Sequence, residues 1–285
     1  MLPSYPLPRA VALGASGVDE VALTSSADAN AQLGFAISAC VGLAIILWEY
    51  VTFLPDEIRL YRRPVWGTIP PYAFLALRYG GILASMPIVF LSAVRSHNCQ
   101  LAASLSQAGV VVVIVGSATI FTFRTAILWA DNRIIRWSLG GLLIIMAGCW
   151  IAPATQYRAL TGPTPPFGSN CHVLPTVVWL PLGNASSALF FITALVLTLL
   201  KIQNHQRKDS LVAHQIYRAN LAYVLGTTIT IAVVLVLKSL SPPSSALVLS
   251  TRCIATVFTV AFGTRAFRNL VLASVFETER AHGIP

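Results

Sequence analysis

Seven long apolar runs, separated by short polar segments, dominate the pattern along this chain. They lie at about 33–54, 72–94, 104–129, 137–153, 173–200, 217–237 and 244–264. A membrane-spanning helix needs roughly 20 mainly apolar residues, and each run is close to that length. The composition agrees, because 56% of the residues are hydrophobic and only 10% are charged, against about 25% charged in soluble domains. The pattern therefore predicts an all-α, polytopic membrane protein built as a seven-helix transmembrane bundle.

The basic residues predict which way this bundle faces. One set of alternating segments holds Arg59, Arg62, Arg63, Arg133, Arg136, Lys201, Arg207, Lys208, Arg265, Arg268 and Arg280. The opposite segments hold only Arg9, Arg95, Arg158 and Lys238. Because cytoplasmic loops carry the excess of Lys and Arg, the amino terminus is expected outside and the carboxyl terminus in the cytoplasm. The net charge of +9 then reflects orientation, and nucleic acid is not an expected partner.

The chain divides into three parts around these runs. Residues 1–32, rich in Ala, Ser and Pro, are predicted to form a disordered extracellular or lumenal tail before the transmembrane domain at 33–264. Residues 265–285 form a cytoplasmic tail, in which Phe267, Leu270, Val271 and Val275 share one face at helical spacing. That face predicts an interfacial helix on the inner leaflet, with a frayed extension of the last span as the alternative. No signal-peptide pattern opens the chain, so the first span is expected to direct insertion into the plasma membrane or another secretory-pathway membrane.

Two of the five cysteines occupy positions that suggest a disulfide. Cys99 lies just before the third run and Cys171 just before the fifth, so both are expected on the outer, oxidising side. A bond between them would pin the long outer loop to the top of the third helix. The alternative is a pair of free thiols, because sequence spacing does not fix their separation.

Three charged residues near the inner ends of the first three spans form a predicted inner polar cluster. Glu49, Arg78 and Arg124 lie at a similar depth, about 8–9 Å from the cytoplasmic ends at 1.5 Å per residue. A Glu49–Arg78 or Glu49–Arg124 pair would reduce the cost of burying either charge. Such a pair would act as a structural latch or a conformational switch. The alternative is that both arginines extend to the phosphate layer.

A second set of polar residues lies in the outer half of the predicted bundle. Arg252 in the seventh run has no acidic residue at its depth, and Gln107 and Asn184 lie in the outer halves of the third and fifth runs. These three are predicted to bind a small anionic or carbonyl-bearing ligand, which the planar guanidinium would hold. In the alternative interpretation, Arg252 bonds backbone carbonyls or Asp28 of the amino-terminal tail.

Part of the chain resembles a known family. The first matching block comprises Trp48-Glu49-Tyr50, Phe53, Asp56-Glu57-Ile58, Arg62-Arg63, Trp66 and Leu77-Arg78-Tyr79; the second comprises Arg124-Thr125-Ala126, Trp129 and Asn132-Arg133. Over roughly residues 20–136 these motifs resemble a large basidiomycete fungal family of seven-helix membrane proteins, catalogued as a domain of unknown function. The resemblance implies a fungal origin and the same fold, and it makes Glu49, Arg78 and Arg124 a family feature. It brings no activity with it.

The sequence argues against several functions. The seventh run has no Lys for a retinal Schiff base, and all five histidines fall outside the predicted spans. With no nucleophile motif, acid pair or metal-ligand cluster visible, neither enzymatic activity nor a cofactor is expected. The favoured hypothesis is a receptor-like protein that binds a small ligand from the outer side and relays a helix shift to an unknown cytoplasmic partner. A transporter or channel, and a structural or scaffold membrane protein, are the alternatives.

Overall fold

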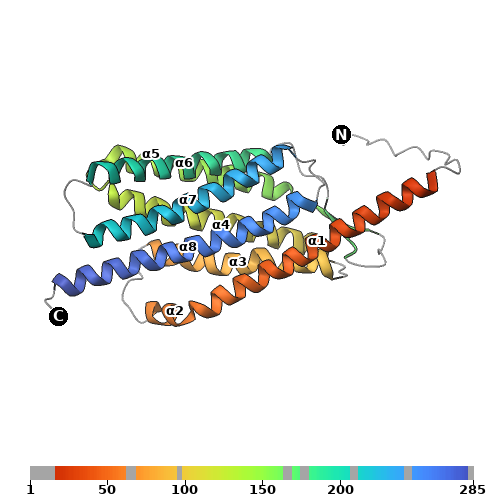
Figure 1. Cartoon of the computed structure of the whole chain (residues 1–285), viewed down its shortest axis with the longest axis horizontal. Coiled ribbons are helices and arrows are strands. Elements are labelled where there is room, and N and C mark those ends of the chain that lie inside the picture. The colour runs from red at the N-terminus through yellow and green to blue at the C-terminus, as the bar shows by residue number, and fades with distance from the viewer. Residues whose placement is uncertain are drawn as a thin grey trace.

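The structure is a computed structural model that describes residues 17–61, 69–94, 98–162, 169–173, 180–205, 211–240 and 246–281. The described helices are α1 (Gly17–Thr52), α2 (Leu54–Tyr61), α3 (Ile69–Ala93), α4 (Cys99–Leu128), α5 (Arg133–Gln156), α6 (Leu180–His205), α7 (Leu211–Leu240) and α8 (Ala246–Ala281). Two short strands, β1 (Ala159–Thr161) and β2 (Cys171–Val173), lie between α5 and α6. Figure 1 shows the long helices side by side in one elongated bundle.

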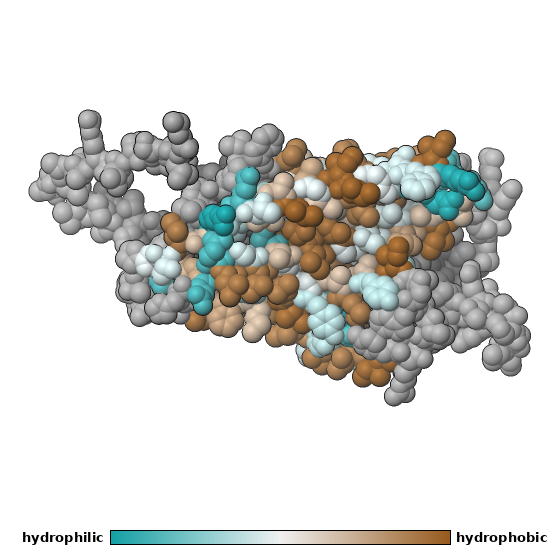
Figure 2. All heavy atoms as spheres, turned by 180° about the vertical axis from the view of Figure 1, so that it is seen from behind, coloured by the Kyte–Doolittle hydropathy of each residue, from teal (hydrophilic) through white to brown (hydrophobic). Residues whose placement is uncertain are grey.

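Five of the described helices contain a segment with the length and hydropathy of a membrane span. Leu33–Thr52, Ile69–Ala93, Cys99–Leu128, Arg133–Gln156 and Pro181–Lys201 each meet both requirements, and α7 contains a shorter apolar stretch, Ala222–Val234. Figure 2 shows hydrophobic side chains over the middle of one face and hydrophilic ones gathered toward its two ends. Apolar side chains that face outward need lipid around them, because a monomeric soluble protein rarely exposes so large an apolar surface. The prediction of an all-α, polytopic membrane protein is therefore confirmed.

The two terminal helices are longer than the predicted spans. Residues 17–32, which the composition predicted to be disordered, belong to α1. At the other terminus, α8 continues without a break to Ala281. Phe267 is buried there and stacks on Phe74 of α3 at 4.5 Å. An interfacial position for the last part of α8 stays a prediction.

Helices α3 and α4 approach each other closely. A Cβ atom on Gly109 would overlap the backbone nitrogen of Ala84, and the Ser106 hydroxyl donates a hydrogen bond to the carbonyl of Ala84 at 3.0 Å. Small residues allow such contact between membrane helices, which lack a hydrophobic driving force toward one another in lipid. The α3–α4 pair is therefore a tightly packed unit at the centre of the fold.

The first and last helices pack side by side and run in the same direction (Figure 1). Ser38 of α1 donates to Ser250 of α8 at 3.1 Å, and further along both helices Glu49 meets Arg265 at 2.5 Å. Residue numbers rise together along this contact, as they must in a parallel pair. We call this contact the α1–α8 seam.

Candidate functional site

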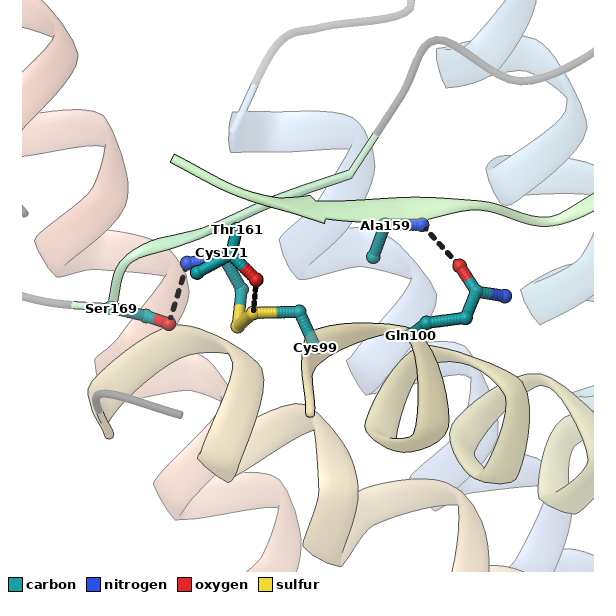
Figure 3. Close-up of a disulfide and its surroundings, with 6 residues drawn as sticks. All are labelled: Cys99, Gln100, Ala159, Thr161, Ser169 and Cys171. Carbon is teal, nitrogen blue, oxygen red and sulfur yellow. Dashed lines mark hydrogen bonds between the residues drawn. A yellow bond between two sulfur atoms is a disulfide. The ribbon is translucent and has the colours of Figure 1, made fainter. Parts of the chain in front are cut away.

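A disulfide-bonded hairpin lies at one end of the bundle (Figure 1), against the start of α4 (Figure 3). β1 and β2 pair antiparallel, with Thr161 opposite Cys171. Cys171 is bonded to Cys99, the first residue of α4, with 5.5 Å between the Cα atoms. The predicted disulfide is therefore present in the structure. The strands were not predicted, because three residues are too short for an alternating pattern to be recognised.

Gln100 fixes the same hairpin from the adjacent position on α4. Its side-chain oxygen accepts a hydrogen bond from the backbone N–H of Ala159 at 2.8 Å, and its amide nitrogen donates to the carbonyl of Tyr157 at 3.1 Å. Cys99, Ala103, Ala159 and Leu91 form a small apolar cluster underneath. The hairpin is thus held to α4 by a covalent bond, by hydrogen bonds and by apolar packing.

A pocket of about 50 Å³ lies inside the bundle at the junction of five helices. It is lined by Val110, Val113 and Ile114 of α4, Trp150 of α5, Asn184 and Ser187 of α6, Ile231 and Val234 of α7, and Ala255, Thr256 and Thr259 of α8. A cavity needs a volume of roughly 10–15 Å³ to hold one water molecule. Sites for drug-sized ligands have volumes of about 300–1,000 Å³. The pocket therefore has room for a few waters or for a very small molecule.

The polar groups that the described residues bring to the pocket are three hydroxyls, one amide and one indole N–H, from Ser187, Thr256, Thr259, Asn184 and Trp150. The Trp150 indole N–H donates to the Ser187 hydroxyl at 2.6 Å, and the Thr259 hydroxyl donates to the carbonyl of Ala255 at 2.8 Å. Within the part of the chain that the structure describes, no charged side chain lines the pocket. Ligands that match this lining are small and mainly apolar, with a hydrogen-bonding group.

The three residues predicted to bind a ligand lie close to this pocket along their helices. Asn184 is buried and lines it. Gln107, also buried, lies three residues before the lining residue Val110, which is about one helical turn. Arg252 lies at the corresponding position before Ala255 on α8, but its side chain is outside the described residues. A ligand-binding role for these three stays a prediction.

Sequence reasoning missed four polar lining residues: Trp150, Ser187, Thr256 and Thr259. Isolated serines and threonines on apolar helices give no signal, because their hydroxyls commonly bond to a carbonyl of their own helix. The Trp150–Ser187 hydrogen bond joins α5 to α6. Only the packing of the two helices brings these groups together.

At the opposite end of the bundle, a buried ion pair joins α2 to α3. Arg78 contacts Glu57 at 2.5 Å, with side chains 3% and 2% exposed. Its guanidinium also donates to the carbonyls of Tyr50 at 2.6 Å and Phe53 at 3.4 Å. The Tyr79 hydroxyl donates to Glu57 at 3.0 Å. Charge pairing and hydrogen bonding together lower the cost of burying both ions.

The predicted pairing of Glu49 with Arg78 or Arg124 is wrong, because the structure pairs Arg78 with Glu57 and Glu49 with Arg265. Pro55 has no N–H to continue the helical ladder of α1, and the chain turns at Phe53 into α2, which brings Glu57 to Arg78. The low exposure of Arg78 does not fit the alternative in which it extends to the phosphate layer. Arg124 is buried in α4, and its grouping with the other two stays a prediction.

The fold and these features define an α-helical, multi-pass integral membrane protein. Residues 37–83 match the model of a family of unknown function, DUF6533. The match agrees with the resemblance seen in the amino-terminal motifs. It covers the carboxyl-terminal part of α1, all of α2 and more than half of α3, and thus both the Arg78–Glu57 pair and Glu49. Comparison with curated proteins gives no match.

Proposed function

We propose that this protein is a receptor-like membrane protein with seven transmembrane helices that binds a small ligand in the pocket between α4, α5, α6, α7 and α8. Its amino terminus lies outside, in the plasma membrane or another secretory-pathway membrane, and it is neither an enzyme nor a cofactor carrier. The observation that carries the proposal is the pocket itself, to which five helices contribute. Sites between the helices of a bundle are a common location for ligands.

The count of seven crossings is supported by the direction of the helices. Five described segments are long and apolar enough to cross a membrane. α7 and α8 have 30 and 36 residues, which exceeds the roughly 20 that a span needs. Because α1 and α8 are parallel neighbours (Figure 1), an odd number of crossings is required. Seven satisfies this condition once the five are joined by α7 and α8.

α8 is the element that would relay binding to the inner face. Ala255, Thr256 and Thr259 line the pocket, and further along the same helix Arg265 contacts α1. The Glu49–Arg265 pair is partly exposed, with Arg265 at 49%, and exposed pairs contribute only about 0–1 kcal/mol. A ligand that binds more tightly when α8 occupies one of two positions would increase the population of that position. Loss of the Glu49–Arg265 pair would oppose this shift only weakly.

A stability screen tests the ligand site. The purified protein would be heated with a library of small neutral and anionic compounds, and compounds that raise the melting temperature would be retested on two variants. Asn184→Leu is expected to abolish the increase, because Asn184 lines the pocket. Ser186→Ala is the matched control, since the Ser186 hydroxyl donates to the carbonyl of Gly183 in its own helix.

Two results would contradict the proposal. Compounds that stabilise the Asn184→Leu variant as strongly as the unmodified protein would bind elsewhere. Flux of a hit across reconstituted liposomes, lost in Arg252→Ala, would instead identify a transporter.

A further inference from the structure

We infer that the inner end of the α1–α8 seam binds the headgroup of an anionic phospholipid, with Arg265 and Arg268 as the residues that hold the phosphate. The site is separate from the pocket and does not require it. It combines a basic pair with an exposed apolar surface that runs along the same two helices.

Arg268 is placed to receive an anion. It is exposed, and its guanidinium carbon lies 5.4 Å from the centre of the Phe53 ring. The Phe53 ring is itself buried, at 5% exposure, so it provides a fixed surface for the guanidinium. Contact with an aromatic face leaves the N–H groups at the edge of the guanidinium available, and that edge matches phosphate oxygens.

The charge balance at this end is positive. Glu57 forms an ion pair with Arg78, and Glu49 forms one with Arg265. Among the described side chains that meet here from α1, α2, α3 and α8, the arginines Arg78, Arg265 and Arg268 exceed the carboxylates Glu49 and Glu57 by one positive charge. Arg265 is half exposed and lies three residues before Arg268, so the two share one side of α8. A negatively charged group would restore neutrality.

The apolar surface beside these arginines favours a lipid over a soluble anion. Exposed Val41, Ile45 and Trp48 recur at helical spacing on α1, and exposed Ile254 and Phe258 lie four residues apart on α8. Trp48, at 73% exposure, has the amphipathic ring that is enriched at membrane interfaces. An acyl chain along these residues would bring its headgroup to the arginines. Anionic lipids concentrate in the cytoplasmic leaflet, which this end faces in the orientation of the proposed function.

The test is a fluorescence titration of the full-length protein in phosphatidylcholine nanodiscs with dansyl-labelled phosphatidylserine. Dansyl-labelled phosphatidylcholine serves as the neutral reference. The unmodified protein is expected to prefer phosphatidylserine, and Arg265→Gln/Arg268→Gln to lose about tenfold or more in affinity, as expected for charge-assisted hydrogen bonds. Arg133→Gln/Arg136→Gln is the matched control, because both arginines are exposed at the start of α5. Arg268→Gln alone leaves Glu49–Arg265 intact and is expected to show a smaller loss.

Three outcomes would overturn the inference. Equal losses in the two double variants would indicate a general surface charge. Equal affinity for the two labelled lipids would remove the headgroup requirement, and displacement by inorganic phosphate would identify a soluble anion site. Since the titration does not involve the pocket, its failure leaves the receptor proposal standing, and failure of the ligand screen leaves the lipid site standing.

Discussion

At the scale of single residues, Arg78 shows how this protein accommodates a buried charge. A lone guanidinium in the interior of a membrane protein is costly. Here it has a carboxylate, two backbone carbonyls and the Tyr50 ring, whose centre is 4.4 Å from the guanidinium carbon. The DUF6533 match includes each of these partners. Their shared role is to hold α2 against α3.

Replacement of Arg78 is therefore expected to leave the Glu57 carboxylate buried without the guanidinium that balances its charge. Arg78→Met is expected to lower the free energy of unfolding by about 3–5 kcal/mol, because Glu57 would keep its burial and lose its partner. The double variant Arg78→Met/Glu57→Gln is expected to regain most of this loss, since a neutral amide can still accept from Tyr79. Denaturant unfolding in detergent micelles measures both variants.

The control for these two variants is Arg133→Met, because Arg133 is exposed at the start of α5. A change within about 0.5 kcal/mol is expected there. A double variant as unstable as the single one would show that the buried charge is not the cause.

At the scale of elements, the α3–α4 contact depends on the absence of side chains. Gly109 lies against the backbone of Ala84, and Gly116 approaches the carbonyl of Ala73 at 3.2 Å from its would-be Cβ. Backbone atoms cannot move aside as a flexible side chain can. The two helices must therefore separate if Gly109 gains a side chain, and shift by a smaller amount if Gly116 does.

Gly109→Ala is expected to destabilise the protein by about 1–3 kcal/mol, as overpacking does. Gly141→Ala on α5 is the matched control, because nothing lies within 4 Å of its would-be Cβ. Alanine favours a helix over glycine by about 0.5–1 kcal/mol, so the control should be neutral or slightly stabilising. Thermal unfolding of the two variants side by side measures the difference, and equal stability would contradict the close approach.

At the scale of the whole molecule, the parallel contact of α1 with α8 supports the proposed topology. In the proposed topology, in which α1 and α8 both cross the membrane, these parallel neighbours would place the two termini on opposite sides. Glycosylation acceptor sequences inserted near each terminus test this. The amino-terminal acceptor is expected to receive a glycan and the carboxyl-terminal one to remain unmodified, as electrophoretic mobility in microsomes would show. Modification of both acceptors, or of neither, would mean an even number of crossings.

The sequence by itself determined the features that depend on local composition. An apolar run long enough to cross a membrane must form a helix there, because lipid offers no partners for backbone N–H and C=O groups. The spans predicted at 33–54, 72–94 and 104–129 therefore agree closely with Leu33–Thr52, Ile69–Ala93 and Cys99–Leu128. Cys99 and Cys171 were likewise found from their positions before two spans, and the structure joins them.

Only the tertiary structure decided which side chains meet. The similar depth of Glu49 and Arg78 on their separate helices predicted that they would pair. In the structure, the turn after α1 brings Glu57 to Arg78, and the α1–α8 seam brings Arg265 to Glu49. The pocket likewise needs five helices in register, with Ser187 held by Trp150. Hydropathy sets where each helix lies along the membrane normal, whereas close packing between helices sets their rotation and neighbours.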